Sequence, residues 1–213
     1  GFVNGIPLLF VELKNTNVDV QNAYTDNYTD YLDTIPHLFY YNAFLILSNG
    51  LEAKVGTLGS KYEFFHEWKR LNENEQGSVA LETMLRGICK KENFLDLLEN
   101  FILFDHSGGR ITKILARNHQ YLGVNEAVKA YEARKLKEGK LGVFWHTQGS
   151  GKSYSMVFLA RKIRRKFAGS PTIVVLTDRD ELNKQISDTF ENCGLLGKAK
   201  ASQFIATSGD DLV

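Results

Sequence analysis

The sequence predicts an α/β chain of two units, the second of which is built on a doubly wound parallel sheet. Two observations indicate this sheet. A glycine-rich loop at residues 146–153 lies between a short apolar run and a stretch with helical apolar spacing, and a β-branched run follows at residues 171–179. Such a continuous run is typical of a parallel strand buried on both faces. The order strand, loop, helix, strand, helix is a βαβ arrangement. In the first half, strands come early and helices follow, which predicts a separate α/β unit.

Composition is that of an ordinary globular protein. The chain has 213 residues, 43% of them apolar and 24% charged, with a net charge of +1, so any contact with nucleic acid must come from local patches. No apolar run approaches the roughly 20 residues that span a bilayer, and no signal peptide is visible. Cys89 and Cys193 stand in unrelated contexts without zinc-site spacing. We therefore expect a cytoplasmic protein without a membrane partner.

The loop that precedes the predicted helix is suited to nucleotide phosphates. Small residues let backbone amides curl around an anion, Lys152 supplies a charge for the β- and γ-phosphates, and the Ser153 hydroxyl can bind Mg²⁺. The helix N-terminus adds its free amides and its dipole. The strict pattern has glycine where His146 stands, and a glycine-rich turn before a helix is the alternative interpretation. The predicted ATP-binding residues of this loop are Thr147, Gln148, Gly149, Ser150, Gly151, Lys152 and Ser153.

The first segment predicts a β-hairpin. Asn4 and Gly5 lie between apolar runs, which is a strong turn signal, and residues 8–15 would form the second strand. The strand before the turn has three residues, and the chain stops soon after its second motor-type segment. We therefore expect the sequence to be part of a longer polypeptide.

The second of these predicted strands has the residues of a metal-dependent nuclease site. Alternation places Phe10, Glu12 and Lys14 on one face. In an E-x-K site the carboxylate holds Mg²⁺ beside the scissile phosphate, and the lysine orients water and offsets negative charge. A solvated strand face gives the same pattern. The nuclease interpretation is favoured because the same chain carries a motor-type phosphate loop.

Aromatic and aliphatic spacing predicts the remaining elements of the first half. Tyr24, Tyr28 and Tyr31 form a helical stripe that we expect to pack in the core. A buried strand at residues 40–50 should pair with residues 52–59 as a hairpin. An amphipathic helix is predicted at residues 62–70.

Helical periodicity continues over residues 81–103 with an interruption near Lys91. A turn-rich break at 105–110 follows, and it gives predicted domains 1–104 and 105–213. A further amphipathic helix is predicted from Val124 to about Lys137.

Two features near the loop have competing interpretations. Gln120 could pair with the adenine edge, because an amide both donates and accepts hydrogen bonds, or it could be an ordinary surface glutamine. The basic run at residues 161–166 could contact DNA, or it could be the cation-rich end that a helix dipole favours.

These blocks together resemble one family. The first half resembles the N-terminal nuclease domain of type I restriction enzyme R (motor) subunits. The blocks that carry this resemblance are GIPL at residues 5–8, FVELKN at 10–15, IPHLFYYN at 35–42 with Tyr31 before it, and SNG at 48–50. The second half resembles the helicase part of that family. NHQY at residues 118–121 resembles the helicase entry, FWHTQGSGKS at 144–153 resembles motif I, and TDRDEL at 177–182 resembles motif Ia. The resemblance covers essentially the whole chain in the right order.

The resemblance implies a PD-(D/E)XK nuclease domain followed by part of a RecA-like domain. It implies ATP-dependent translocation of double-stranded DNA by a superfamily-two motor, followed by cleavage, in a complex with specificity and methyltransferase subunits. Glu12 and Lys14 would be nuclease residues, with Glu12 on Mg²⁺, while the loop would hold ATP–Mg²⁺ and Gln120 would read adenine. Many such nucleases carry a Gln-x-x-x-Tyr element, and here Tyr31 matches while Asn27 replaces the glutamine.

The resemblance also places further active-site carboxylates before Gly1 and after Val213. We therefore expect the 213-residue chain alone neither to hydrolyse ATP efficiently nor to cut DNA. A RecB-like repair helicase–nuclease would share the E-x-K and the phosphate loop, but not the block at residues 36–42. A degenerate nuclease fold that serves as a DNA-binding or subunit-docking platform is the non-enzymatic alternative. A metabolite kinase is disfavoured, because no small-substrate lid or acceptor motif is visible.

Overall fold

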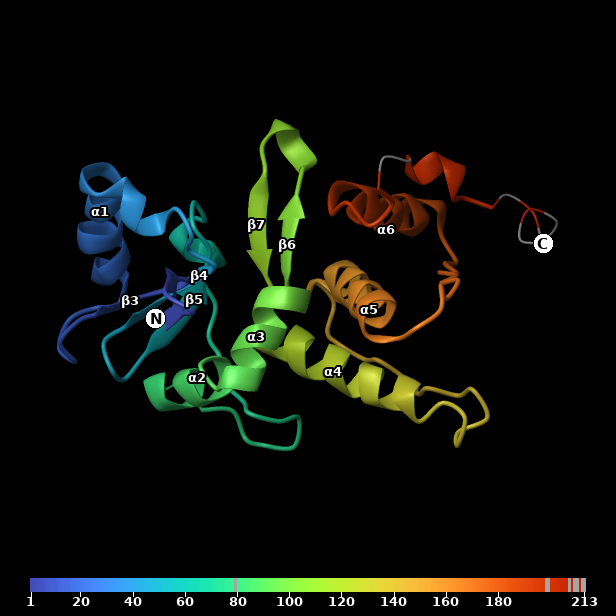
Figure 1. The fold of residues 1–213 in the computed structure, drawn as a ribbon, viewed down its shortest axis with the longest axis horizontal. Coiled ribbons are helices and arrows are strands. Elements are labelled where there is room, and N and C mark those ends of the chain that lie inside the picture. The colour runs from blue at the N-terminus through green and yellow to red at the C-terminus, as the bar shows by residue number, and fades with distance from the viewer. Residues whose placement is uncertain (79, 198–199, 207, 209–210, 212–213) are drawn as a thin grey trace. The chain divides into compact units, whose positions relative to one another are not determined.

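The computed structural model describes residues 1–213 except 79, 198–199, 207, 209–210 and 212–213. It divides into two compact units (Figure 1). The first comprises Gly1–Ile102 and Lys113–Asn125, and the second comprises Leu103–Thr112 and Glu126–Val213. The predicted boundary between residues 104 and 105 remains a prediction.

Strands β6 (Ile102–Asp105) and β7 (Thr112–Leu115) form a hairpin with the short 3₁₀ turn η4 (Ser107–Gly109) at its tip. The boundary between the two units passes through this hairpin and through helix α4 (Asn118–Glu132). Helix α4 begins six residues before the predicted start at Val124.

The predicted N-terminal turn is confirmed. Asn4 and Gly5 have positive φ angles of 50° and 81°, as a tight two-residue hairpin turn requires. They join β1 (Phe2–Val3) to β2 (Ile6–Pro7), which pair antiparallel. The prediction that residues 8–15 form the second strand of this hairpin is wrong. Leu8 N and Leu9 N still donate to Gly1 O, at 3.0 and 3.1 Å, but β3 (Leu9–Leu13) is a strand of another sheet, in which it pairs with residues 44–48.

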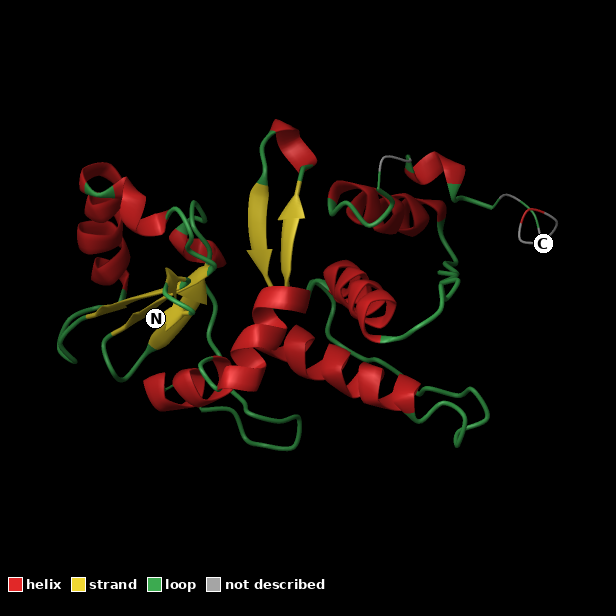
Figure 2. Cartoon of the chain, viewed as in Figure 1, coloured by secondary structure: helices red, strands yellow, loops and turns green. Residues whose placement is uncertain are grey.

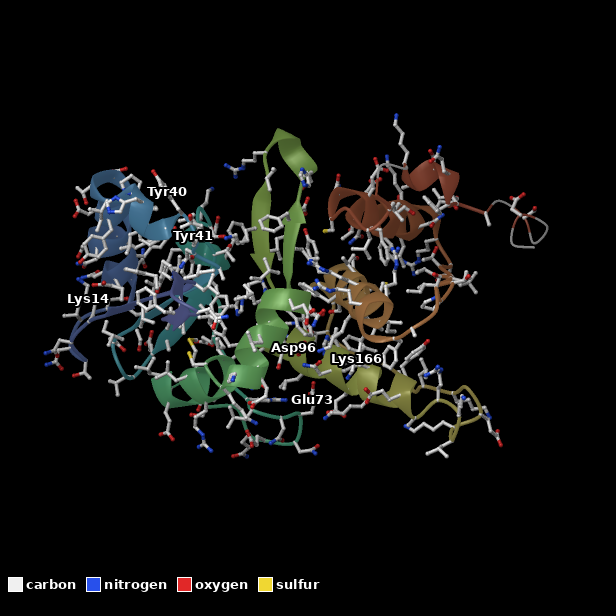
Figure 3. All side chains as sticks on the ribbon, in the orientation of Figure 1. Lys14, Tyr40, Tyr41, Glu73, Asp96 and Lys166 are labelled. Carbon is white, nitrogen blue, oxygen red and sulfur yellow. The ribbon has the colours of Figure 1, made fainter. Side chains whose placement is uncertain are left out.

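A three-stranded sheet organises the first unit. Strand β4 (Phe44–Ser48) lies between β3, to which it is parallel, and β5 (Ala53–Gly56), to which it is antiparallel. All five residues of β4 are buried. The predicted β4–β5 hairpin is confirmed, but β4 is shorter than the predicted strand. Residues Pro36–Phe39 form the 3₁₀ helix η2, and Tyr40 and Tyr41, labelled in Figure 3, are exposed.

Each face of this sheet is covered by helices. On one face lie a π-helical segment, η1 (Ala23–Tyr28), and helix α1 (Thr29–Thr34). The predicted core role of the tyrosine stripe is confirmed, since Tyr28 is buried and Tyr24 and Tyr31 pack against the same cluster. On the other face, the rings of Phe44 and Phe94 have centroids 5.2 Å apart. The buried members of the first cluster are Val20, Ala23, Tyr28, Phe39, Leu45, Leu47 and Phe65.

The helix predicted at residues 62–70 is wrong. Only a 3₁₀ turn, η3 (Tyr62–Phe64), forms there, and His66 then pairs with Val55 through backbone bonds of 2.8 and 3.0 Å. Phe65 and Trp68 are buried. The open side of β5 offers backbone hydrogen bonds to this segment, and an extended chain can use them while both aromatic rings enter the core.

The two helices predicted within residues 81–103 are confirmed as α2 (Leu81–Ile88) and α3 (Lys91–Asn100), although the range ends in β6. Gly87 lies directly against the Trp68 indole: a Cβ at this position would be 2.2 Å from Trp68 Nε1. The absence of a side chain at Gly87 thus lets Trp68 pack against α2.

The second unit contains helices α5 (Lys152–Lys166) and α6 (Asp180–Asn192), which pack against each other, and the 3₁₀ turn η5 (Ala201–Gln203) (Figure 2). The strands predicted at residues 141–145 and 171–179 are wrong for this structure. No strand forms in the continuous described stretch 126–197, and the side chains of Val143 and Leu176 are more than 90% exposed. A doubly buried parallel strand needs strand neighbours, and the described residues of this unit supply none. None of the described helices has the length and apolar character to cross a bilayer.

Candidate functional site

Glu12 lies on the sheet face that η1 and α1 cover. In the parallel pairing, Phe10 is aligned with Leu45 and Glu12 with Leu47. Leu45, Leu47 and Phe10 all belong to the core cluster on that face, so Glu12 stands beside apolar side chains. Loss of surrounding water raises the pKa of the Glu12 carboxyl, and the positive charge of Lys14 acts in the opposite direction. The E-x-K pair is therefore close enough to interact electrostatically, as predicted for one strand face.

Lys14 is held by the helical segment above it. Its backbone N–H donates to Ser48 O at 2.8 Å, and its ammonium donates to Asn27 Oδ1. Asn27 Nδ2 in turn donates to Tyr31 Oη at 3.4 Å. Figure 3 labels Lys14 where β3 ends. The structure thus joins Lys14, Asn27 and Tyr31 in one chain of contacts.

The Asn27 side-chain amide makes both kinds of hydrogen bond, since it accepts from Lys14 and donates to Tyr31. It lies in the π-helical segment η1, four residues before Tyr31. Single-turn π-helical segments occur frequently at functional sites. The sequence indicated this residue only through the Asn-x-x-x-Tyr spacing.

The phosphate loop has the backbone geometry that its glycines predict. Gly149 and Gly151 have φ angles of 76° and 81°, in the left-handed region that glycine adopts without a steric penalty. Gly151 is the N-cap residue of α5, so the helix begins at Lys152. The exposed Lys152 ammonium donates to the carbonyl oxygens of His146 and Thr147, at 2.8 and 3.3 Å. Phosphate oxygens would compete with these two carbonyls for the same ammonium.

The Ser153 hydroxyl lies in the first turn of α5 and accepts a hydrogen bond from Gln185 Nε2 of α6 at 3.4 Å. A half-buried hydroxyl at a helix N-terminus, next to a lysine, fits a Mg²⁺ ion that bridges nucleotide phosphates. For the nuclease metal, no group of three His, Cys, Asp or Glu side chains suited to a metal occurs among the described residues. Among the predicted nuclease residues Glu12, Lys14 and Tyr31, Glu12 carries the carboxylate, and its role as a ligand of that ion remains a prediction.

Sequence reasoning missed a contact that fixes the start of α5. Tyr154 Oη donates to Asp105 Oδ2 at 2.6 Å, and Ser107 N donates to Asp105 Oδ1 at 2.7 Å. Burial by itself would raise the pKa of Asp105, but the hydrogen bonds from Tyr154 and Ser107 outweigh it and leave that pKa lowered. Burial, and then Asp105, raise the pKa of Tyr154. Because 49 positions separate the partners, no local pattern could reveal the bond.

Gln120 lies in the first turn of α4 and is only 4% exposed. Its Oε1 accepts a hydrogen bond from Arg117 N at 2.8 Å, which satisfies a backbone donor at the start of the helix. It is therefore a buried residue rather than an ordinary surface glutamine. Gln120 belongs to the first unit and the phosphate loop to the second, so its contact with adenine remains a prediction.

Two family models match the chain. Residues 1–64 match the type I restriction enzyme R protein N terminus. Residues 119–213 match the SWI2/SNF2 ATPase family. The first match contains Glu12, Lys14, Asn27 and Tyr31, and the second contains Gln120 and the phosphate loop.

Several curated relatives of this chain are named as type I restriction enzyme endonuclease subunits. This chain is 40% identical to the Type I restriction enzyme HindI endonuclease subunit of Haemophilus influenzae over 204 residues. The aligned residues cover 90% of this chain and 19% of the relative. The chain is 31% identical to the putative type I restriction enzyme MjaIXP endonuclease subunit of Methanocaldococcus jannaschii, covering 96% of this chain and 22% of the relative. A Staphylococcus aureus endonuclease subunit, SauCOLORF180P, is 25% identical, covering 88% of this chain and 20% of the relative. The chain thus spans about a fifth of the length of the curated relatives it matches. Over most of its length, the chain is thus similar to type I restriction enzyme endonuclease subunits, and its residues 1–64 match the N terminus of the R protein.

Proposed function

We propose that this chain is part of the ATP-dependent DNA-translocating and DNA-cleaving subunit of a type I restriction–modification system. One observation carries the proposal: a single polypeptide holds a Lys14–Asn27–Tyr31 cluster beside Glu12 and a phosphate loop that ends at Lys152. The matches to an R protein N terminus and to an ATPase support these two parts separately.

The second unit supplies nucleotide binding. The left-handed glycines let the loop amides face an anion, and the Lys152 ammonium would exchange its carbonyl partners for β- and γ-phosphate oxygens. The Ser153 hydroxyl would bind Mg²⁺, and Gln120 would select adenine. We further propose that the second unit belongs to a RecA-like motor domain, which the match of residues 119–213 to an ATPase family supports.

The first unit supplies cleavage chemistry in a PD-(D/E)XK domain over residues 1–104. Glu12 would be one ligand of Mg²⁺, which polarises the scissile phosphate and lowers the pKa of bound water. Lys14 would offset the negative charge that develops at the phosphate. Asn27 holds the lysine ammonium in place, and Tyr31 orients the Asn27 amide. The substrate would be double-stranded DNA, and the partners would be the specificity and methyltransferase subunits.

The test uses the complete subunit assembled with those partners. Glu12→Ala should abolish DNA cleavage and leave DNA-stimulated ATP hydrolysis intact, while Lys152→Ala should abolish both activities. Glu52→Ala is the matched control, because Glu52 is an exposed carboxylate in the turn between β4 and β5. Unchanged cleavage in the Glu12 variant would instead support the docking-platform function. The repair helicase–nuclease alternative is disfavoured, since residues 1–64 match the R protein N terminus.

A further inference from the structure

Asn118, the first residue of α4, binds a distant segment of the first unit through its side chain. Its Oδ1 accepts hydrogen bonds from Lys69 N and Arg70 N at 3.2 and 3.0 Å, and its Nδ2 donates to Arg70 O at 2.9 Å. The residue is buried, at 8% exposure. An amide oxygen has two lone pairs, and both are used here. Asn118 therefore fastens the start of α4 to residues 69–70.

The segment that Asn118 binds is itself fixed to the three-stranded sheet. His66 pairs with Val55 of β5 through backbone bonds of 2.8 and 3.0 Å. Trp68 is buried, and its indole lies directly against Gly87 of α2. An unbroken line of contacts thus runs from β5 through residues 66–70 to the start of α4.

Gln120 lies in the same helical turn as Asn118. Its Oε1 accepts a hydrogen bond from Arg117 N at 2.8 Å, and Tyr121 N donates to Arg117 O at 2.9 Å, which closes the turn. The Tyr121 ring packs against Trp68 with centroids 5.3 Å apart. Contacts on both sides of Gln120 along the chain therefore tie its backbone to the first unit.

We propose that Asn118 is a positioning residue that fixes Gln120 for the selection of adenine, an inference that rests on the proposed role of Gln120. Adenine presents an amino donor where guanine presents an oxygen acceptor, and a correctly placed amide distinguishes the two bases. Hydrogen bonds weaken steeply as their geometry departs from the optimum, so a displaced Gln120 should bind adenine less well. The phosphate loop would bind the groups that ATP and GTP share. The ratio of the two affinities therefore reports on Gln120 separately from the loop.

The test measures equilibrium binding of fluorescent, non-hydrolysable ATP and GTP analogues to the complete subunit. Gln120→Ala gives the ratio of affinities without the adenine contact. Asn118→Ala should lower the ATP-to-GTP ratio about fivefold to tenfold, through weaker binding of the ATP analogue alone. Asn118→Asp keeps the two bonds that Oδ1 accepts and loses the one to Arg70 O, so its ratio should fall only about twofold to threefold.

Asn49→Ala is the matched control, because Asn49 makes the same pattern of bonds in the turn between β4 and β5. Its Oδ1 accepts from Leu51 N and Glu52 N at 3.1 and 2.8 Å, and its Nδ2 donates to Val18 O at 2.9 Å. It is also buried, at 7% exposure. Asn49→Ala should therefore lower stability much as Asn118→Ala does and leave the ratio unchanged.

A ratio in Asn118→Ala equal to that of the Asn49 control overturns the inference. So does an equal loss of affinity for both analogues, which would show that Asn118 supports the fold and not the choice of base. If Asn118→Ala fails to fold, Asn118→Asp decides, and an unaltered ratio in that variant overturns the inference. A ratio that Gln120→Ala leaves unchanged would instead overturn the proposed role of Gln120, and the inference with it.

Discussion

The Tyr154 hydroxyl donates to the Asp105 carboxylate at 2.6 Å and so anchors the first turn of the phosphate-loop helix to the hairpin. Asp105 is buried and holds a second bond from Ser107 N. Because Tyr154 follows Lys152 and Ser153 directly, this bond restrains the residues that we propose to face the nucleotide phosphates.

Removing that hydroxyl should loosen the loop. Tyr154→Phe should weaken binding of an ATP analogue severalfold and speed hydrogen exchange of the amides at residues 152–156, since a hydrogen bond to a charged group contributes about 1.5 to 3 kcal/mol. Tyr131→Phe is the control, because the Tyr131 ring packs against Phe167 with centroids 4.8 Å apart and keeps that packing without its hydroxyl. Equal exchange in both variants would show that the bond does not restrain the loop.

The amide of Asn27 should matter for cleavage and not for translocation. Asn27→Ala leaves the Lys14 ammonium without its side-chain partner, and DNA cleavage by the complete complex should fall about tenfold to a hundredfold, as expected for a charged hydrogen bond. Asn27→Gln should retain more activity, because it keeps both amide groups. ATP hydrolysis in the same samples serves as the internal reference. Asn17→Ala, at an exposed asparagine in the loop between β3 and η1, should leave cleavage normal.

Stability should fall in mild acid because of His66. Burial, followed by the charge of Arg117, lowers the pKa of His66 from 6.5 to about 4. Between pH 6.5 and 4 the unfolded chain therefore takes up a proton that the folded chain does not. The free energy of unfolding should drop across this window by up to about 3 kcal/mol and flatten below it. Urea titrations of the His66→Gln variant should show a drop that is smaller by this amount.

Gly56 should not tolerate a side chain. A Cβ there would be 2.6 Å from the Phe65 ring, and Phe65 is buried in the core cluster of the first unit. Gly56→Ala should therefore lower the free energy of unfolding by about 1 to 3 kcal/mol, measured by denaturant titration. Gly77→Ala is the comparison: its Cβ would lie 3.2 Å from the Lys69 Cβ, and a shift of a few tenths of an ångström in this exposed segment relieves that contact. Equal losses for the two variants would contradict this account of Gly56.

The amino-acid sequence alone determined the features whose signals are local. The Asn4–Gly5 turn, the β4–β5 hairpin and the two helices at residues 81–103 follow from residue types that restrict φ or repeat with a fixed period. The phosphate loop was recognisable because its glycines and its lysine are adjacent in the chain. The resemblance to type I restriction enzyme R subunits followed from the order of such blocks.

Tertiary structure decided the features that depend on distant partners. Residues 62–70 have helical spacing, yet they are largely extended because β5 presents open backbone groups to them. Residues 141–145 and 171–179 have strand composition, yet in this structure they lack the neighbours that strands require. Asp105 and Tyr154 meet across 49 positions, and Arg164 turns from a helix-end cation into the wall of a cavity only when the hairpin and α6 are folded. Hydrogen bonds and burial depend on proximity in space, which a period along the chain does not encode.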